Sequence, residues 1–484
     1  MQTNSALPTN DKKTASGENA VFVLPEFKVS GVFGSHMVLQ RKRPVKIWGF
    51  SDAEGSEIKG ELDGEKASAK VKNGVFTLTF SAREASFDPI AMRIYDGRGH
   101  ETVFDDILIG DVWMIGGQSN AELNLRFVLP ETLPEKFDDN GAYRLFMQTQ
   151  AYPYTHQELC ASPQPDVICP DWSWKLPDSE ASLSFSALGW FFAEKLCKTA
   201  KVPVGAINIS AGGACIRELV PAALAAEMGY DYGANVCQCG YYNTLIHPFE
   251  GLQFYGMVFF QGESEGGSRE LAERYDKELE RLVRDERERF GFDFPFYNVQ
   301  LCSYRAEGKQ YFPFLETVRM KQFDAKHEIK NSYLSVAMDL GSPADWGDFA
   351  HSPKKKALTD RITGLVLAKE YGIGSFEEAS SPEPVKASLS GGAVVIKFRY
   401  ATGGLSSRNG DTVNGFSFGN FDDLIPAEAR ITAPDTVEVA VPEGACTEYI
   451  NYAYISDVNE NNAGLYKSNG LPCPAFRIKV FKET

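Results

Sequence analysis

The pattern of apolar and polar positions divides the chain into three regions. From Phe27 to about Phe104, short segments with alternating apolar and polar residues are separated by Gly and Asp, as in Val45–Gly49 and Val75–Phe80. This alternation predicts antiparallel strands in a β-sandwich or half of one. Residues 1–24 are rich in Thr, Asn and Ser and predict a disordered tail. We therefore expect an N-terminal β region over residues 25–104.

From about Asp105 the pattern changes to continuous apolar runs that alternate with amphipathic helices. One helix is predicted over Arg274–Phe290 by its apolar stripe, and a second is predicted after Ser352, which would be its N-cap. Strands that are apolar on both faces are typical of a parallel sheet covered by helices on both sides. We therefore expect a three-layer α/β domain over residues 105–378. Its predicted strands are Val112–Ile115, Val204–Ile209, Gly256–Phe260, Phe296–Leu301 and Leu334–Met338.

The strand pattern returns from about Pro384, for example in Ala393–Phe398 and Thr436–Val441. A C-terminal β region is therefore expected over residues 379–484. Three regions agree with the length of 484 residues, which is too long for one typical domain. The pattern leaves open whether the two β regions form one sandwich or two.

Composition and charge limit the partners and the location of the protein. The net charge of −16 disfavours nucleic acid and an anionic membrane surface as partners, and no apolar run is long enough to span a membrane. The odd number of nine cysteines fits free thiols in a reducing compartment. The first 24 residues lack the apolar segment of a secretory signal, so we expect a cytoplasmic protein, or a secreted one if a signal was removed. The oligomeric state does not follow from the sequence.

The strongest chemical signal is Ser119, which lies on a Gly-rich turn directly after an apolar run. A hydroxyl at the end of a buried strand can act as a nucleophile when a base and oxyanion donors lie nearby. The second glycine of a Gly-x-Ser-x-Gly elbow is missing here. His351 is the candidate base, and Asp348, three residues earlier, can orient it from the same loop. Asp345 is a second candidate for the orienting carboxylate.

Four short blocks follow one another in an order that carries a resemblance. Ser119 lies in Gly-Gln-Ser-Asn, Gly213 in Ser-Ala-Gly-Gly-Ala, Gln261 in Gln-Gly-Glu-Ser and His351 in Asp-x-x-His. This order resembles the SGNH hydrolase superfamily. Further blocks make the chain similar to the sialate O-acetylesterase family and related carbohydrate acetylesterases over about residues 30 to 480. These blocks are Phe33–Arg41, Phe185–Gly189, Tyr242–Pro248, Val299–Leu301 and Asn469–Pro472.

The resemblance implies a flavodoxin-like SGNH domain with a mainly parallel sheet, flanked by jelly-roll-like β regions. It implies a carboxylic ester hydrolase that releases acetate from acetylated sugars. Ser119 would be the nucleophile, His351 the base and Asp348 its orienting group. The oxyanion hole would consist of the Ser119 N–H, the Gly213 N–H and the Gln261 side-chain amide.

The predicted scheme needs no cofactor and no metal. Cys237–Cys239 is a single Cys-x-Cys without the second pair of a zinc site. Asp457–Asn461 lacks the glycine and the terminal glutamate of a calcium loop and is interpreted as a polar loop.

Four residues are predicted to contact substrate: Gln118, Asn120, Asn243 and Glu263. Glu263 has a second interpretation as a buried carboxylate that braces its own loop. The predicted partner is an acetylated oligosaccharide or an acetylated sialic acid.

The aromatic positions favour one of these two substrates. The chain has Ala211 and Phe259–Phe260 where the family usually has Trp and a Trp-Tyr pair. This favours acetylated hemicellulose fragments of the xylan or mannan type. Sialate 9-O-acetylesterase activity is the alternative. It would need an Arg or Lys side chain to bind the sialate carboxylate, and Arg126 and Arg217 are the candidates. An inactive carbohydrate-binding protein is the alternative of another class.

Overall fold

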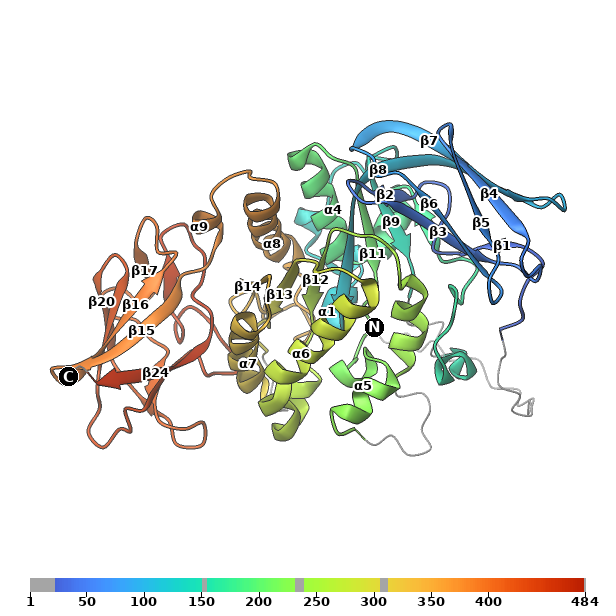
Figure 1. Cartoon of the computed structure of the whole chain (residues 1–484). Helices are drawn as coiled ribbons and strands as arrows, with labels where there is room; N and C mark the ends of the chain where they lie inside the picture. Colours follow the sequence, from blue (N-terminus) through green and yellow to red (C-terminus); the bar gives the residue numbers. More distant parts are fainter. Residues whose placement is uncertain (1–21, 150–154, 231–238, 305–311, 483–484) are drawn as a thin grey trace, which may run out of the picture.

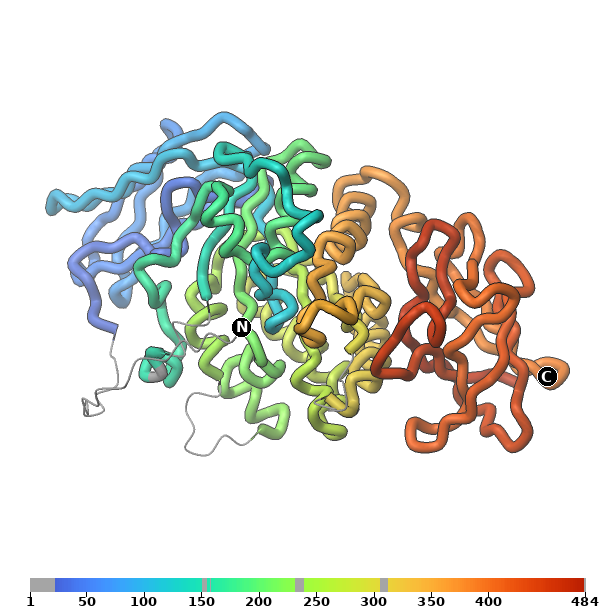
Figure 2. The backbone as a smooth tube through the Cα atoms, turned by 180° about the vertical axis from the view of Figure 1, so that it is seen from behind, coloured from blue at the N-terminus to red at the C-terminus, as the bar shows by residue number. Residues whose placement is uncertain are grey.

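The structure is a computed structural model that describes residues 22–149, 155–230, 239–304 and 312–482. An N-terminal β region, a central α/β region and a C-terminal β region lie side by side in chain order (Figure 1), and the view from behind shows the same order (Figure 2). The fold is therefore mixed α/β with several sheets. Most of the predicted tail, residues 1–21, lies outside the described residues.

The N-terminal β region contains two groups of strands. β1 (Lys28–Val29), β3 (Val45–Phe50) and β6 (Val75–Phe80) form an antiparallel sheet. The other group, joined through β8, consists of β2 (Val38–Gln40), β4 (Glu57–Leu62), β5 (Glu65–Lys70) and β7 (Ser86–Asp96). Alternate residues of β4 and β6 are buried, as the sequence pattern predicts: Ile58 and Leu62 from β4, Leu78 and Phe80 from β6.

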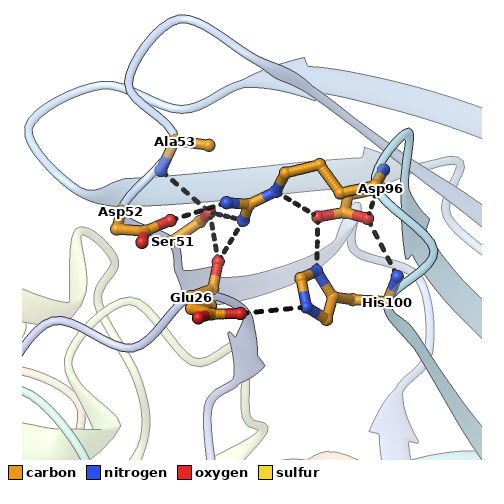
Figure 3. A network of polar contacts seen from close by, with 7 residues as sticks. Glu26, Ser51, Asp52, Ala53, Asp96 and His100 are labelled. Atoms are coloured by element: carbon orange, nitrogen blue, oxygen red, sulfur yellow. Dashed lines mark hydrogen bonds and ion pairs between the residues drawn. The ribbon is translucent and has the colours of Figure 1, made fainter.

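A polar network joins the turn between β7 and β8 to the start of the region (Figure 3). Arg98 donates to Asp96 at 2.9 Å, to Asp52 at 2.8 Å and to the carbonyl of Glu26. His100 lies 2.9 Å from the same Asp96 carboxylate and 3.3 Å from the Glu26 carboxylate. Burial of Asp96 opposes ionisation, but the bonds from His100 and Arg98 outweigh it and hold the pKa of Asp96 well below its usual value. The network fixes the turn that leads into β8.

Strand β8 (Glu101–Gly117) is 17 residues long and belongs to both the N-terminal and the central region. Its first half pairs antiparallel with β7, and its second half pairs parallel with strands of the central sheet. The burial pattern alternates up to Asp106 and is continuous from Ile107 onward. The boundary expected between residues 104 and 105 therefore lies inside one continuous strand.

The central sheet has the strand order β10-β9-β11-β8-β12-β13-β14. All neighbours in it are parallel except β10, which pairs antiparallel at the edge. The predicted apolar runs are confirmed as strands, although β14 begins two residues before the predicted start. The strands besides β8 are β9 (Tyr143–Met147), β10 (Ser173–Lys175), β11 (Val204–Asn208), β12 (Gly256–Phe260), β13 (Phe296–Gln300) and β14 (Ser332–Val336).

Helices cover both faces of this sheet (Figure 1). α6 (Arg269–Phe290) and α7 (Leu315–Glu328) connect β12 to β13 and β13 to β14, and they pack together on one face. Each helix thus forms the crossover connection that two neighbouring parallel strands need. α4 (Ala187–Ala200) and α8 (Lys355–Glu370) pack together on the other face. The shorter helices are α1 (Ser119–Glu122), α3 (Ser179–Ser184), α5 (Ala222–Glu227) and α9 (Phe376–Ala379).

Two predicted helix starts are wrong. α6 begins at Arg269, five residues before the predicted start. α8 begins at Lys355 with Lys354 at its N-cap, so Ser352 is not the cap. Ser352 Oγ accepts the backbone N–H of Lys354 at 3.2 Å and donates to the carbonyl of Leu340, so Ser352 forms a turn before the helix and does not cap it.

The C-terminal β region rests on one end of the central sheet. Its core includes Phe323 of α7 and Val336 of β14 together with strand residues such as Ile396 and Ile450. Its main sheet has the order β19-β18-β22-β24-β15-β16-β21-β20. These strands are β15 (Glu383–Ser390), β16 (Ala393–Arg399), β18 (Phe416–Phe418), β19 (Ile425–Pro426), β20 (Ala429–Ala433), β21 (Thr436–Ala440), β22 (Tyr449–Tyr452) and β24 (Phe476–Lys482). A two-stranded sheet adds β17 (Leu405–Ser407) and β23 (Leu465–Lys467).

The described residues contain neither a disulfide nor a helix that could span a membrane. The eight cysteines in the described residues are all free thiols, and Cys237 lies outside those residues. None of the described helices combines the length and the apolar character that a membrane span needs.

Candidate active site

Ser119 lies at the carboxyl end of β8, where α1 begins. Gly117 adopts the left-handed φ of 129°, and a Cβ there would come within 2.0 Å of the carbonyl oxygen of Phe260. Only glycine therefore lets β8 approach β12 so closely at this point. The residues before Ser119 are buried, whereas Ser119 itself is partly exposed. Its hydroxyl is thus placed at the rim of the sheet.

β8 lies at the point where the strand order of the sheet reverses. The chain builds β9 and β11 on one side of β8 and then crosses to build β12, β13 and β14 on the other side. In open α/β sheets such a switch point opens a crevice at the carboxyl ends of the strands. The turns after β11 and β12 meet the Ser119 turn there, because Ala211 N donates to Gly117 O at 3.0 Å and Gln118 N donates to Phe260 O at 3.0 Å.

The structure brings the Asp348–His351 loop to the same edge. His351 Nδ1 lies 2.8 Å from Asp348 Oδ2, while Asp348 Oδ1 accepts the backbone N–H groups of Ala350 and His351 at 3.0 and 3.1 Å. Burial opposes ionisation of Asp348, but the bonds from His351 outweigh it and lower the pKa of Asp348. Asp348 therefore stays a carboxylate that can orient the imidazole, whereas Asp345 is exposed.

Asn120 connects this loop to the serine turn. Its Nδ2 donates to the carbonyl of Ala350 at 3.0 Å, so the neighbours of Ser119 and His351 are bound to each other. No hydrogen bond joins Ser119 Oγ to His351 within the described residues. Bonds between nucleophile and base commonly tighten only when substrate binds.

The predicted oxyanion donors differ in their surroundings. The N–H groups of Ser119 and Gly213 have no acceptor among the described residues. Gly213 has a left-handed φ of 75° and open space around it. The Gln261 side chain is fully buried, and its Nε2 donates to Ala214 O at 3.0 Å and to Glu265 Oε2 at 2.5 Å. Its role as an oxyanion donor stays a prediction.

Two of the predicted substrate contacts are occupied by protein groups. Gln118 is 2% exposed, and its Oε1 accepts the backbone N–H groups of Gly262 and Ser264 at 3.1 and 3.4 Å. Asn243 donates to the carbonyl of Cys160 at 2.7 Å. Both side chains thus hold backbone segments, and their contact with substrate stays a prediction.

The other two predicted contacts, Asn120 and Glu263, belong to a buried cluster with Lys355. Asn120 Nδ2 donates to Glu263 Oε1 at 2.6 Å, and Lys355 Nζ donates to Asn120 Oδ1 at 2.6 Å. Burial raises the pKa of Glu263 and lowers the pKa of Lys355 to about 8. Lys355 also lies 5.0 Å from the centre of the Phe260 ring. The cluster supports the second interpretation of Glu263, as a brace.

Lys355 is the residue that sequence reasoning missed. It precedes Leu358, Ile362 and Leu365, so it occupies the apolar stripe of α8. A charged residue on such a stripe is rarely buried without a partner. This position was the available signal for a polar cluster beneath the site.

No group of three or more His, Cys, Asp or Glu side chains could hold a metal ion within the described residues. The single Cys-x-Cys of Cys237–Cys239, which was not expected to bind zinc, lies partly outside them.

The model of the family described as "carbohydrate esterase, sialic acid-specific acetylesterase" matches residues 109–363, which include Ser119, Gly213, Gln261 and His351. The chain belongs to this family. The predicted family membership is thereby confirmed, and this member of the sialic acid-specific acetylesterase family is a carboxylic ester hydrolase.

Individual relatives agree with the family match. The human sialate O-acetylesterase is 24% identical over 398 residues, which cover 74% of each chain. The mouse sialate O-acetylesterase is 23% identical over 411 residues, which cover 72% of this chain and 74% of the mouse protein. The crystal structure of a carbohydrate acetylesterase from Xanthomonas citri aligns with a TM-score of 0.79 and 27% identity, covering 94% of this chain and 99% of that one. The likeness thus includes the flanking β regions.

Proposed function

We propose that this protein is a carbohydrate O-acetylesterase that works through an acetyl-enzyme on Ser119. The observation that carries the proposal is the joint position of Ser119, at the switch point of the sheet, and the Asp348–His351 pair, tied to it through Asn120. We also assign the central region to the three-layer SGNH type and the flanking regions to β-sandwiches. The parallel strand order and the paired helices support this assignment.

The reaction proceeds in two halves. Ser119 Oγ attacks the acetyl carbonyl carbon while His351 Nε2 takes the hydroxyl proton, because Nδ1 is held by Asp348. The N–H groups of Ser119 and Gly213 stabilise the oxyanion. The bond to the sugar oxygen breaks, and His351 returns the proton to that oxygen. Water, deprotonated by His351, then attacks the carbonyl carbon of the acetyl-serine ester. The bond from that carbon to Ser119 Oγ breaks, His351 returns the proton to Oγ, and acetate is released.

For the substrate we propose acetylated oligosaccharides, with a sialate ester as the second candidate. The second candidate is favoured by the human and mouse relatives, both sialate O-acetylesterases. Neither arginine considered for a sialate carboxylate supports it: Arg126 donates to the carbonyl of Leu183, and Arg217 lies against the ring of Tyr230. Acetate release from acetylated xylan fragments, acetylated mannan fragments and 9-O-acetylated sialic acid would separate the candidates.

The test of the chemistry is Ser119→Ala. We expect the variant to fold normally, because Ser119 is partly exposed at a turn, and to lose hydrolysis of 4-nitrophenyl acetate. A fluorophosphonate should label the unmodified protein on Ser119 and leave the variant unlabelled. Full activity in the variant would refute the nucleophile, and an unlabelled but sugar-binding protein would support the inactive binding protein instead.

A further inference from the structure

A polar cavity of about 580 Å³ lies at the same edge of the central sheet as Ser119. Ser303 follows β13 and Asp339 follows β14, so both line it from the carboxyl ends of these strands. Gly341 and Lys354 line it from the two flanks of the Asp348–His351 loop. β13 and β14 are the second and third neighbours of β8 in the strand order. At a strand spacing of about 4.8 Å, β13 and β14 lie about 10 and 14 Å from β8, the strand that ends at the Ser119 turn.

The C-terminal β region supplies the opposite wall. The lining residues from that region include Arg408, Asp457, Asn459 and Tyr466. The cavity is therefore built jointly by the catalytic loop and by the C-terminal region.

A buried arginine fixes this wall in place. Arg319 of α7 is fully buried, and its guanidinium donates to the carbonyls of Leu301 and Cys302 at 3.0 and 2.5 Å. It also donates to the carbonyls of Ile455 and Ser456 at 2.6 and 3.0 Å. The segment after β13 and the C-terminal loop are thus held by one side chain. Burying a charge is costly unless it is fully bonded, so the position of this loop is strongly determined.

A direct bond closes the same junction. Ser303 Oγ donates to Asp457 Oδ1 at 3.0 Å, directly beside the cavity. The wall is therefore preorganised, which reduces the cost of ordering groups around a ligand.

The chemistry of the lining favours an uncharged, hydroxyl-rich ligand. Arg361 is paired with Asp339 at 2.6 Å. The remaining cations, Lys354 and Arg408, are matched in number by the carboxylates of Asp457 and Glu460. Serine and asparagine side chains add neutral donors and acceptors, which suit sugar hydroxyls. The lining therefore has no excess positive charge that would attract an anionic ligand group.

We infer that this cavity binds neutral sugar units of an oligosaccharide whose acetylated residue lies at Ser119. The inference rests on the proposed function and extends it: the enzyme acts on a chain, and the C-terminal β region takes part in binding that chain. Ligands of open α/β sheets bind outside the carboxyl ends of the strands, where this cavity lies, and a volume of about 580 Å³ is within the range of ligand sites.

The test compares substrates of increasing length. For the unmodified enzyme, we expect kcat/KM on acetylated xylo-oligosaccharides to rise with chain length. In Arg408→Ala, kcat/KM on the longest substrate should fall by about tenfold, which corresponds to the loss of one or two hydrogen bonds. Hydrolysis of 4-nitrophenyl acetate should not change, because this ester does not reach the cavity. Arg408 is exposed and lies on the ring of Tyr466, so the variant should fold.

Arg477→Ala is the matched control, because Arg477 lies on the ring of Tyr449 in the same region but does not line the cavity. It should leave all substrates unaffected. The inference is overturned if kcat/KM does not depend on chain length, or if Arg408→Ala lowers only the hydrolysis of 9-O-acetylated sialic acid. Each of these results is compatible with Ser119 chemistry, whereas failure of the Ser119→Ala test would refute the function itself.

Discussion

Asn120 is the residue on which the geometry of the site depends most directly, and Asn120→Ala tests this. The side chain makes three hydrogen bonds, to Glu263, to Lys355 and to the carbonyl of Ala350. Lys355, with a pKa of about 8, is charged at pH 7. Truncation therefore leaves a buried ammonium group and a half-buried carbonyl without this partner.

The expected loss follows from these bonds. A hydrogen bond to a charged group contributes about 1.5–3 kcal/mol, and an unsatisfied buried group costs about 1–3 kcal/mol. We expect the free energy of unfolding, measured by urea denaturation, to fall by about 3–5 kcal/mol. We also expect kcat on 4-nitrophenyl acetate to fall by about 10–100-fold, because releasing Ala350 lets His351 move away from Ser119.

Asn451→Ala is the matched control. Asn451 is also fully buried, but its Nδ2 donates only to the neutral carbonyls of Ser417 and Gly419, at 3.4 and 3.2 Å. It should lose about 1–2 kcal/mol and keep its kcat. The reasoning would be refuted if Asn120→Ala were no less stable than Asn451→Ala, or if it kept the kcat of the unmodified enzyme.

Two further predictions concern single carboxylates. Asp348→Asn should lower kcat on 4-nitrophenyl acetate by about 10²–10⁴-fold, because the amide cannot stabilise the protonated imidazole. Asp345→Asn is the control and should leave kcat unchanged. Equal losses of kcat in the two variants would contradict the assignment of Asp348. Burial raises the pKa of Glu286 from 4.5 to about 8, so the protein should lose up to about 4–5 kcal/mol of unfolding free energy as the pH rises from 4.5 through 8. Glu286→Gln should remove this part of the pH dependence in urea titrations, and an unchanged slope would show that Glu286 does not cause it.

The sequence predicted the parts of the molecule that depend on local pattern. Continuous apolar runs such as Gly256–Phe260 are strands, because a strand covered on both faces has no polar side. The positions of Ser119 and Gly213 at strand ends followed from the same runs. The family was predicted from ordered motifs and is confirmed.

What the sequence could not supply depends on partners far apart in the chain. Lys355 and Asn120 are 235 residues apart, and nothing local to either residue indicates their bond. The same holds for the bond of Gln261 to the carbonyl of Ala214, which lies 47 residues earlier in the chain. The start of α8 was misplaced because the Ser352 hydroxyl accepts the N–H of Lys354 in a turn before the helix and donates to the distant Leu340 carbonyl, a tertiary contact.

The continuity of β8 has a consequence for folding and for engineering. The strand that ends beside Ser119 begins in the N-terminal sheet, where it pairs with β7. A fragment that starts at residue 105 would cut this ladder and expose the edge of β7. The N-terminal sheet and the catalytic sheet should therefore melt in a single cooperative transition. A region without any proposed catalytic residue is, on this view, an inseparable part of the folding unit that carries the nucleophile.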